Sequence, residues 1–202
     1  YRQHLAAQAA ERMNLSARAQ HLLLILMFVT LAYTGFALQF PHAWWASPFF
    51  GHGDWRRFGH RAAALTFCAL ALYHLWFIFG TRRGRRELSD LRPRRIDGVQ
   101  PWHMLGYYLG VRPERPVLAR YSYVEKAEYW ALVWGSMIMV LTGGLMTWQN
   151  WTLRVFPKWF FDVIRAIHWY EAVLACSAIL IWHCYWVLFD PDEYTMKWTW
   201  IT

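Results

Sequence analysis

The sequence predicts an all-α integral membrane protein, a bundle of four transmembrane helices. The chain has 202 residues, of which 57% are hydrophobic and only 17% are charged, and this is too apolar for an ordinary soluble domain. Four apolar runs reach the roughly 18 residues that a spanning helix needs. These runs cover residues 22–40, 62–80, 129–151 and 166–189. We expect one membrane domain over residues 1–202, with helices at about 17–40, 58–80, 126–151 and 163–189.

The distribution of positive charge predicts how the bundle is oriented. The formal net charge is +8, and 11 of the 21 Lys and Arg residues lie between Arg82 and Lys126, mostly in the loop that joins the second and third predicted helices. Loops rich in Lys and Arg stay on the cytoplasmic side, so the loop 81–125 and both termini are predicted to be cytoplasmic. Membrane orientation therefore explains the charge, and we expect no nucleic-acid partner. Residues 1–20 show no signal-peptide pattern, so the first helix is expected to stay in the protein.

Each predicted element carries a recognisable local pattern. The first helix contains YTGF and the third contains LTGG, so a Thr-Gly pair recurs in the two helical hairpins. Glycine at these positions allows close helix packing, or the close approach of a flat macrocycle. The basic loop contains four prolines and several glycines, so partly irregular structure on the membrane face is expected there. Three cysteines within the predicted spans are interpreted as small packing residues.

The histidines form a pattern that suggests a cofactor. Of the nine histidines, His60 and His74 are about 21 Å apart along the second helix, and His168 and His183 about 22 Å apart along the fourth. Both separations are close to four helical turns, so each pair keeps roughly one helix face. The predicted topology puts His60 level with His168, and His74 level with His183. A single membrane histidine is as readily a hydrogen-bonded packing residue, but matching depths are harder to explain in that way.

Two layers of imidazoles suit two six-coordinate b-type haems, each with one axial ligand from either side. Zinc would need more ligands in one place, and a proton relay would need carboxylates at intermediate depths. The inner layer has one histidine too many, because His21, His74 and His183 compete for two axial positions. Depth favours His74 opposite His183, since His21 lies close to Arg18 at the start of the first helix.

Several motifs together point to a known family. They are RAQH at the start of the first helix, RFGH at the start of the second, the two Thr-Gly pairs, and the two histidines of the fourth helix. With these motifs the chain resembles the four-helix membrane cytochrome b subunits of the formate dehydrogenase gamma and hydrogenase b-type cytochrome family. The resemblance implies that His60 and His168 hold the outer haem, and that His21 and His183 hold the inner haem.

The chain departs from the family pattern in two ways. The spacing between the two histidines of the fourth helix is one residue longer than expected, and His74 is additional. The additional histidine is similar to the two-histidine helix of respiratory-complex cytochromes b, which would pair His74 with His183. A third haem held by the surplus histidine is a further alternative. Haem propionates need cationic partners, and the candidates beside the proposed ligands are Arg18, Arg57, Arg61 and Arg165. Lipid headgroup binding is the alternative role for each of these arginines.

Two haems with irons about 20 Å apart would conduct electrons across the bilayer, and such a path needs a donor and an acceptor. The chain has no G-x-G-x-x-G for a nucleotide and no cysteine cluster for an iron–sulfur centre. At least one of the donor and the acceptor must therefore be another subunit. The resemblance implies that the other is a membrane quinone. Quinone chemistry needs titratable groups, and the candidates are Glu171 on the outer side and Glu125, Lys126, Glu128 and Tyr129 on the inner side. The alternatives are a salt bridge from Glu171 to an arginine such as Arg61, and an ordinary solvated helix start for the inner group.

The leading hypothesis is a dihaem electron-transfer subunit and anchor of an oxidoreductase complex in the bacterial cytoplasmic membrane. It would pass electrons between quinone and a peripheral redox subunit of the iron–sulfur or multihaem cytochrome c type, and would not be a complete enzyme by itself. One alternative is a stand-alone transmembrane haem reductase, which would be active without a partner chain. Another is a membrane scaffold whose histidines only pack, which would be colourless.

Overall fold

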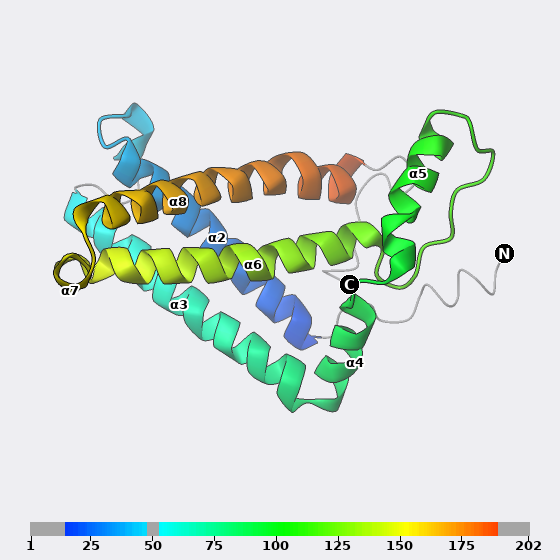
Figure 1. The fold of residues 1–202 in the computed structure, drawn as a ribbon, viewed down its shortest axis with the longest axis horizontal. Helices are drawn as coiled ribbons and strands as arrows, with labels where there is room; N and C mark the ends of the chain where they lie inside the picture. The colour runs from blue at the N-terminus through cyan, green and yellow to red at the C-terminus, as the bar shows by residue number, and fades with distance from the viewer. Residues whose placement is uncertain (1–14, 48–52, 190–202) are drawn as a thin grey trace. The chain divides into compact units, whose positions relative to one another are not determined.

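The computed structural model describes residues 15–47 and 53–189, and these residues form helices and connecting loops without strands (Figure 1). Four helical spans are long and apolar enough to cross a membrane. They are α2 (Leu15–Gln39), α3 (Gly53–Gly80), α6 (Tyr123–Thr147), and α8 (Lys158–Ser177) with its continuation to Phe189. The all-helical class with four membrane-capable helices is therefore confirmed. Both chain ends lie outside the described residues, so the cytoplasmic termini stay a prediction.

The described chain divides into two compact units. The first unit holds α2, the short helix η1 (Trp44–Ala46), α3 as far as His74, and residues 172–189. The second unit runs from Leu75 to Glu171. It contains α4 (Arg82–Leu91), η2 (Arg95–Gly98), α5 (Gln100–Tyr108), α6 and α7 (Gln149–Val155). Figure 1 shows α7 as the short turn that links α6 to α8. The single domain over residues 1–202 stays a prediction.

Local sequence explains where the helices of the second unit begin. At the start of α6, Ser122 Oγ accepts a hydrogen bond from the Glu125 backbone N–H (3.3 Å), while the Glu125 carboxylate accepts one from the Ser122 N–H (2.7 Å). This capping box starts the helix at Tyr123, three residues before the predicted boundary. Phe156 is extended before Pro157, which separates α7 from α8.

The basic loop between α3 and α6 is more ordered than the expectation of partly irregular structure. It folds into α4, η2 and α5, and residues 109–122 follow without a helix. The turn from α3 into α4 requires glycine at position 84, because a Cβ there would lie 2.1 Å from the Phe77 carbonyl oxygen. Trp130 of α6 donates its indole N–H to the Leu91 carbonyl at the end of α4 (2.9 Å). The loop therefore packs closely on the ends of the spanning helices of its unit.

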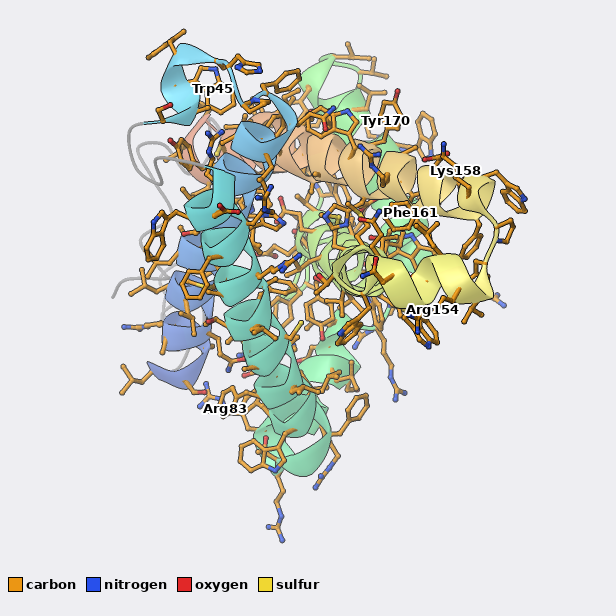
Figure 2. The ribbon with its side chains drawn as sticks, turned by 90° about the vertical axis from the view of Figure 1, so that its left-hand side faces the viewer. Trp45, Arg83, Arg154, Lys158, Phe161 and Tyr170 are labelled. Carbon is orange, nitrogen blue, oxygen red and sulfur yellow. The ribbon has the colours of Figure 1, made fainter. Side chains whose placement is uncertain are left out.

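The spanning helices expose apolar side chains, as helices in contact with lipid do. Tyr170 is 69% exposed, whereas Phe161 on the same helix is buried (Figure 2). Large contiguous apolar surfaces are rare on soluble monomers, but they are required where a helix faces hydrocarbon. The charged residues Arg154 and Lys158 lie at the turn between α7 and α8 (Figure 2). The pattern fits apolar spans that end at a polar membrane surface.

Candidate haem-binding site

His60 is fixed from α2 by a threonine. Its Nδ1 atom lies 2.8 Å from the Oγ1 atom of Thr34, a side chain that is fully buried. Thr34 Oγ1 also donates to the Thr30 carbonyl at 2.6 Å, one helical turn earlier. A hydroxyl has one proton, so once this proton goes to the carbonyl the oxygen accepts from the imidazole N–H. This arrangement favours the tautomer of His60 with the proton on Nδ1, in which Nε2 carries the lone pair that a metal needs.

His168 has the same arrangement within the second unit. Its Nδ1 atom lies 2.8 Å from Thr142 Oγ1, and this hydroxyl donates to the Ile138 carbonyl at 2.7 Å. Thr142 is also buried. In both cases the threonine precedes its histidine by 26 residues. The recurring Thr-Gly pair thus supplies a hydrogen-bond partner for a proposed haem ligand in each hairpin, which the sequence reasoning had missed.

The glycines of the two Thr-Gly pairs lie against the same imidazoles. A Cβ at Gly35 would be 3.3 Å from His60 Cε1, and a Cβ at Gly143 would be 3.2 Å from His168 Cε1. Each glycine therefore makes room for a histidine ring beside the helix. The sequence had suggested helix packing or a macrocycle as the reason for these glycines. The signal that could have identified their partners is the repeated Thr-Gly to His spacing.

The inner candidates separate into a histidine pair and a hydrogen-bonded chain, all within the first unit. The ring centres of His21 and His183 are 6.4 Å apart. Two imidazoles on opposite sides of one iron, each with a bond of about 2 Å, would have ring centres about 6 Å apart. The geometry thus fits the inner pair that the resemblance implies.

His74 has a different partner from the other inner candidates. Its Nδ1 atom lies 2.9 Å from Gln20 Oε1, and Gln20 Nε2 donates to Ser16 Oγ at 3.1 Å. Ser16 is in turn bonded to the Tyr73 hydroxyl at 3.0 Å. This chain ties the start of α2 to α3, which gives His74 a packing role.

The fourth helix changes geometry before His183. After α8 the chain continues as two π-helical segments, η3 (Ala178–His183) and η4 (Tyr185–Phe189). A π turn holds about one residue more than an α turn, and such segments occur frequently at functional sites. The segment η3 can therefore accommodate the one additional residue in the spacing between His168 and His183 without the rotation that an extra α-helical residue would cause.

The four propionate candidates lie in different surroundings. Arg61 and Arg165 are exposed, Arg18 is half-buried, and Arg57 is exposed and forms an ion pair with Asp54. The sequence reasoning had missed Arg56, which is buried and donates from its guanidinium to the Ala37 carbonyl at the end of α2 (2.8 Å). A cation that binds the last carbonyls of a helix stabilises that end.

Glu171, the outer quinone candidate, lies against the backbone of α6. Its Oε1 atom is 2.7 Å from the position that a Cβ would occupy at Gly135, so the carboxylate takes the space of a missing side chain. Among the described residues of its own unit, Glu171 forms no ion pair. A half-buried carboxylate in a spanning helix is costly unless it has a function or a polar partner.

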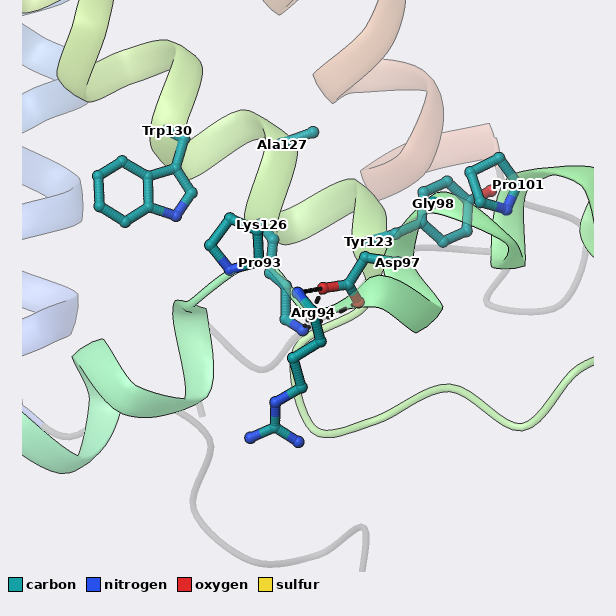
Figure 3. Close-up of a pocket in the computed structure, with 9 residues that line it drawn as sticks. All are labelled: Pro93, Arg94, Asp97, Gly98, Pro101, Tyr123, Lys126, Ala127 and Trp130. Carbon is teal, nitrogen blue, oxygen red and sulfur yellow. Dashed lines mark hydrogen bonds and ion pairs between the residues drawn. The ribbon is translucent and has the colours of Figure 1, made fainter.

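Among the inner quinone candidates, Lys126 lines a cavity of about 410 Å³ at the start of α6 (Figure 3). Apolar side chains that include Pro93 and Trp130 form part of its wall. Lys126 is 4% exposed and donates to both carboxylate oxygens of Asp97, at 2.8 and 2.9 Å. Desolvation opposes ionisation of Asp97, but the hydrogen bonds and positive charge of Lys126, together with the Arg94 backbone, hold the Asp97 pKa below its usual value.

The other inner candidates do not line this cavity. Glu125 belongs to the capping box of α6, as expected for an ordinary helix start. Glu128 and Tyr129 follow in the first turns of α6 and are half-buried. Within residues 15–47 and 53–189, no three His, Cys, Asp or Glu side chains gather as a metal-ion site would need. A haem with two axial histidines does not require such a cluster.

Residues 12–194 match the family model described as prokaryotic cytochrome b561. The matched segment contains all four spanning helices and the five histidines discussed above. No curated protein matches the chain.

Proposed function

Because this chain belongs to the prokaryotic cytochrome b561 family, a family of membrane proteins that transfer electrons through b-type haem, we propose that it is the dihaem subunit and anchor of an oxidoreductase complex. It would pass electrons between the quinone pool and a peripheral redox subunit of the iron–sulfur or multihaem cytochrome c type. The proposed location is the bacterial cytoplasmic membrane.

The dihaem part of the proposal rests on the ring separation of one histidine pair and on the Nδ1 hydrogen bonds of two other histidines. His21 and His183 have the ring separation that one iron between them would need. His60 and His168 are each held through Nδ1, which leaves Nε2 as the ligand nitrogen. We assign His21 and His183 to the inner haem, and His60 and His168 to the outer haem, following the family resemblance. Bound haem would supply a one-electron iron couple whose potential depends on its axial ligands and their hydrogen bonds.

The quinone end of the path needs a group that handles protons. Oxidation of a quinol releases two electrons and two protons, so a titratable side chain beside the quinone must accept or relay the protons. Glu171 offers a carboxylate between two helices, and Lys126 offers an ammonium group in an apolar cavity. The variants Glu171→Gln and Lys126→Met distinguish the two sides, because only the variant at the quinone site will slow haem reduction by quinol.

The test of this function uses the chain purified from its native membrane in mild detergent. A short-chain quinol analogue should reduce its haem within the mixing time of a rapid-scan absorbance experiment, and redox subunits should co-purify. Haem-loaded protein that quinol cannot reduce would contradict the quinone role. Turnover with a ferric chelate in the absence of any partner chain would identify a stand-alone reductase instead.

A further inference from the structure

The same three-residue arrangement occurs once in each unit. In the first unit Thr34 and Gly35 of α2 contact His60 of α3. In the second unit Thr142 and Gly143 of α6 contact His168 of α8. The hydrogen-bond lengths agree at 2.8 Å, and the glycine approaches agree within 0.1 Å, at 3.3 and 3.2 Å. Two separate parts of the chain have thus arrived at one local geometry.

The threonine hydroxyl offers the imidazole Nδ1 atom an acceptor, and so favours the proton on that nitrogen. Each hydroxyl bonds the carbonyl four residues earlier at 2.6 or 2.7 Å, and the carbonyl three residues earlier is farther away, at 3.3 or 3.4 Å. The short bond takes the hydroxyl proton, so only the oxygen lone pairs face Nδ1. Because both hydroxyls are buried, water does not compete strongly for this position. This arrangement favours an imidazole that donates from Nδ1.

The glycine limits how closely the same edge of the ring can approach the helix, because Cε1 and then Nδ1 are the ring atoms nearest to its missing Cβ. Cε1 lies between the two ring nitrogens, and it is the atom closest to the missing Cβ in both cases. A methyl group at 3.2 or 3.3 Å would push the ring by a few tenths of an ångström, next to the nitrogen that would bind iron. The threonine thus favours one tautomer, and the glycine permits the ring position that goes with it.

We propose that Thr34 and Thr142 are positioning residues, which hold His60 and His168 in the Nδ1-protonated tautomer and orient Nε2 toward haem iron. This inference rests on the proposed function, because it takes both histidines as ligands. A hydrogen bond donated from Nδ1 makes the imidazole a stronger electron donor. A stronger donor favours ferric over ferrous iron, so each threonine lowers the midpoint potential of the haem that its histidine ligates.

The test compares isosteric and conservative replacements at each threonine. Thr34→Val and Thr142→Val remove the hydroxyl at nearly constant volume, while Thr34→Ser and Thr142→Ser keep it. Thr30→Val is the matched control, because Thr30 donates to the Leu26 carbonyl in the same helix. Each purified variant is measured for its haem-to-protein ratio, its midpoint potentials by redox titration, and the g-values of its ferric haems by electron paramagnetic resonance.

In each valine variant we expect one haem to shift to a higher midpoint potential, with changed g-values because the imidazole plane is less fixed. The serine variants and Thr30→Val should resemble the wild type. If a valine variant loses haem altogether, full loading of the corresponding serine variant supports the same role. Valine variants with wild-type potentials and g-values would overturn the inference while leaving the proposed function intact. A wild-type chain without haem would overturn both.

Discussion

At the scale of single residues, the ring separation between two histidines favours a different inner pair from the one that depth favours. Depth along the sequence favours His74 opposite His183, but the structure places the ring centres of His21 and His183 6.4 Å apart. Sequence spacing could predict which histidines matter, because a helix has a fixed rise. It could not predict side-chain partners between helices, since these depend on how α2 and α3 pack.

We therefore expect His21→Ala and His74→Ala to differ in haem content. His21→Ala should lose one of the two proposed haems, since it removes a proposed axial ligand, whereas His74→Ala should keep both. Haem-to-protein ratios of the purified variants measure this directly. Loss of a haem in His74→Ala alone would assign the inner ligand to His74.

Asp97 provides a pH-dependent contribution to stability. Its folded-state pKa lies below the usual 3.8, so its contribution is fully present above that pH and is lost as the pH falls through the lower folded value. Asp97→Asn leaves Lys126 buried without its carboxylate, so we expect a loss of about 3 kcal/mol at pH 7. Thermal unfolding in detergent, followed by circular dichroism, measures the change.

A matched control exists for this ion pair. The exposed pair of Asp90 and Arg120 is 3.6 Å apart, and Asp90→Asn should change stability by less than about 1 kcal/mol. Equal changes in the free energy of unfolding for Asp97→Asn and Asp90→Asn would show that the Lys126–Asp97 pair stabilises the fold no more than an exposed pair does.

At the scale of elements, the sequence predicted the four spans and the partly irregular character of the connecting loop, but not the short helices within that loop. Long apolar runs indicate a spanning helix whatever their packing, whereas α4 lies in a stretch of arginines that resembles a solvated charge run. Its start depends on the Thr81 side chain, which accepts from the Gly84 N–H at 2.9 Å. The π geometry of η3 could not be predicted either, because it reflects the packing of one surplus residue.

The turn between α3 and α4 should not tolerate a side chain at Gly84. Gly84→Ala would place a Cβ 2.1 Å from the Phe77 carbonyl oxygen, so we expect a loss of more than about 2 kcal/mol. Gly98→Ala is the control, because no atom lies within 4 Å of its added Cβ. Limited proteolysis and thermal unfolding compare the two, and a stable Gly84→Ala variant would contradict the observed turn.

The π segment should tolerate a deletion better than an insertion. Leu180 is an exposed residue of η3, and removing it shortens the spacing between His168 and His183 by one residue. A regular α-helix of that length would place His183 on nearly the same side of the helix as the π segment does, so both haems should be retained. Adding one alanine after Leu180 rotates His183 away from its site and should lose one haem. Haem ratios for the two variants give the answer, and the reverse outcome would contradict the role assigned to η3.

At the scale of the whole molecule, the chain is a member of the prokaryotic cytochrome b561 family with four membrane-capable helices. The motifs RAQH, RFGH and Thr-Gly were sufficient to identify a membrane cytochrome b, because they combine histidines with small residues. The identity of the partner and the side that binds quinone could not be derived in this way. Both depend on how another molecule, the partner subunit or the quinone, binds to the surface of this chain.

The most direct test of the account is the number of haems that the purified chain binds. We predict two b-type haems per chain by pyridine haemochrome assay against quantitative amino-acid analysis, because the four proposed histidine ligands would make two axial pairs. A purified, folded chain that contains no haem would contradict the account at its centre.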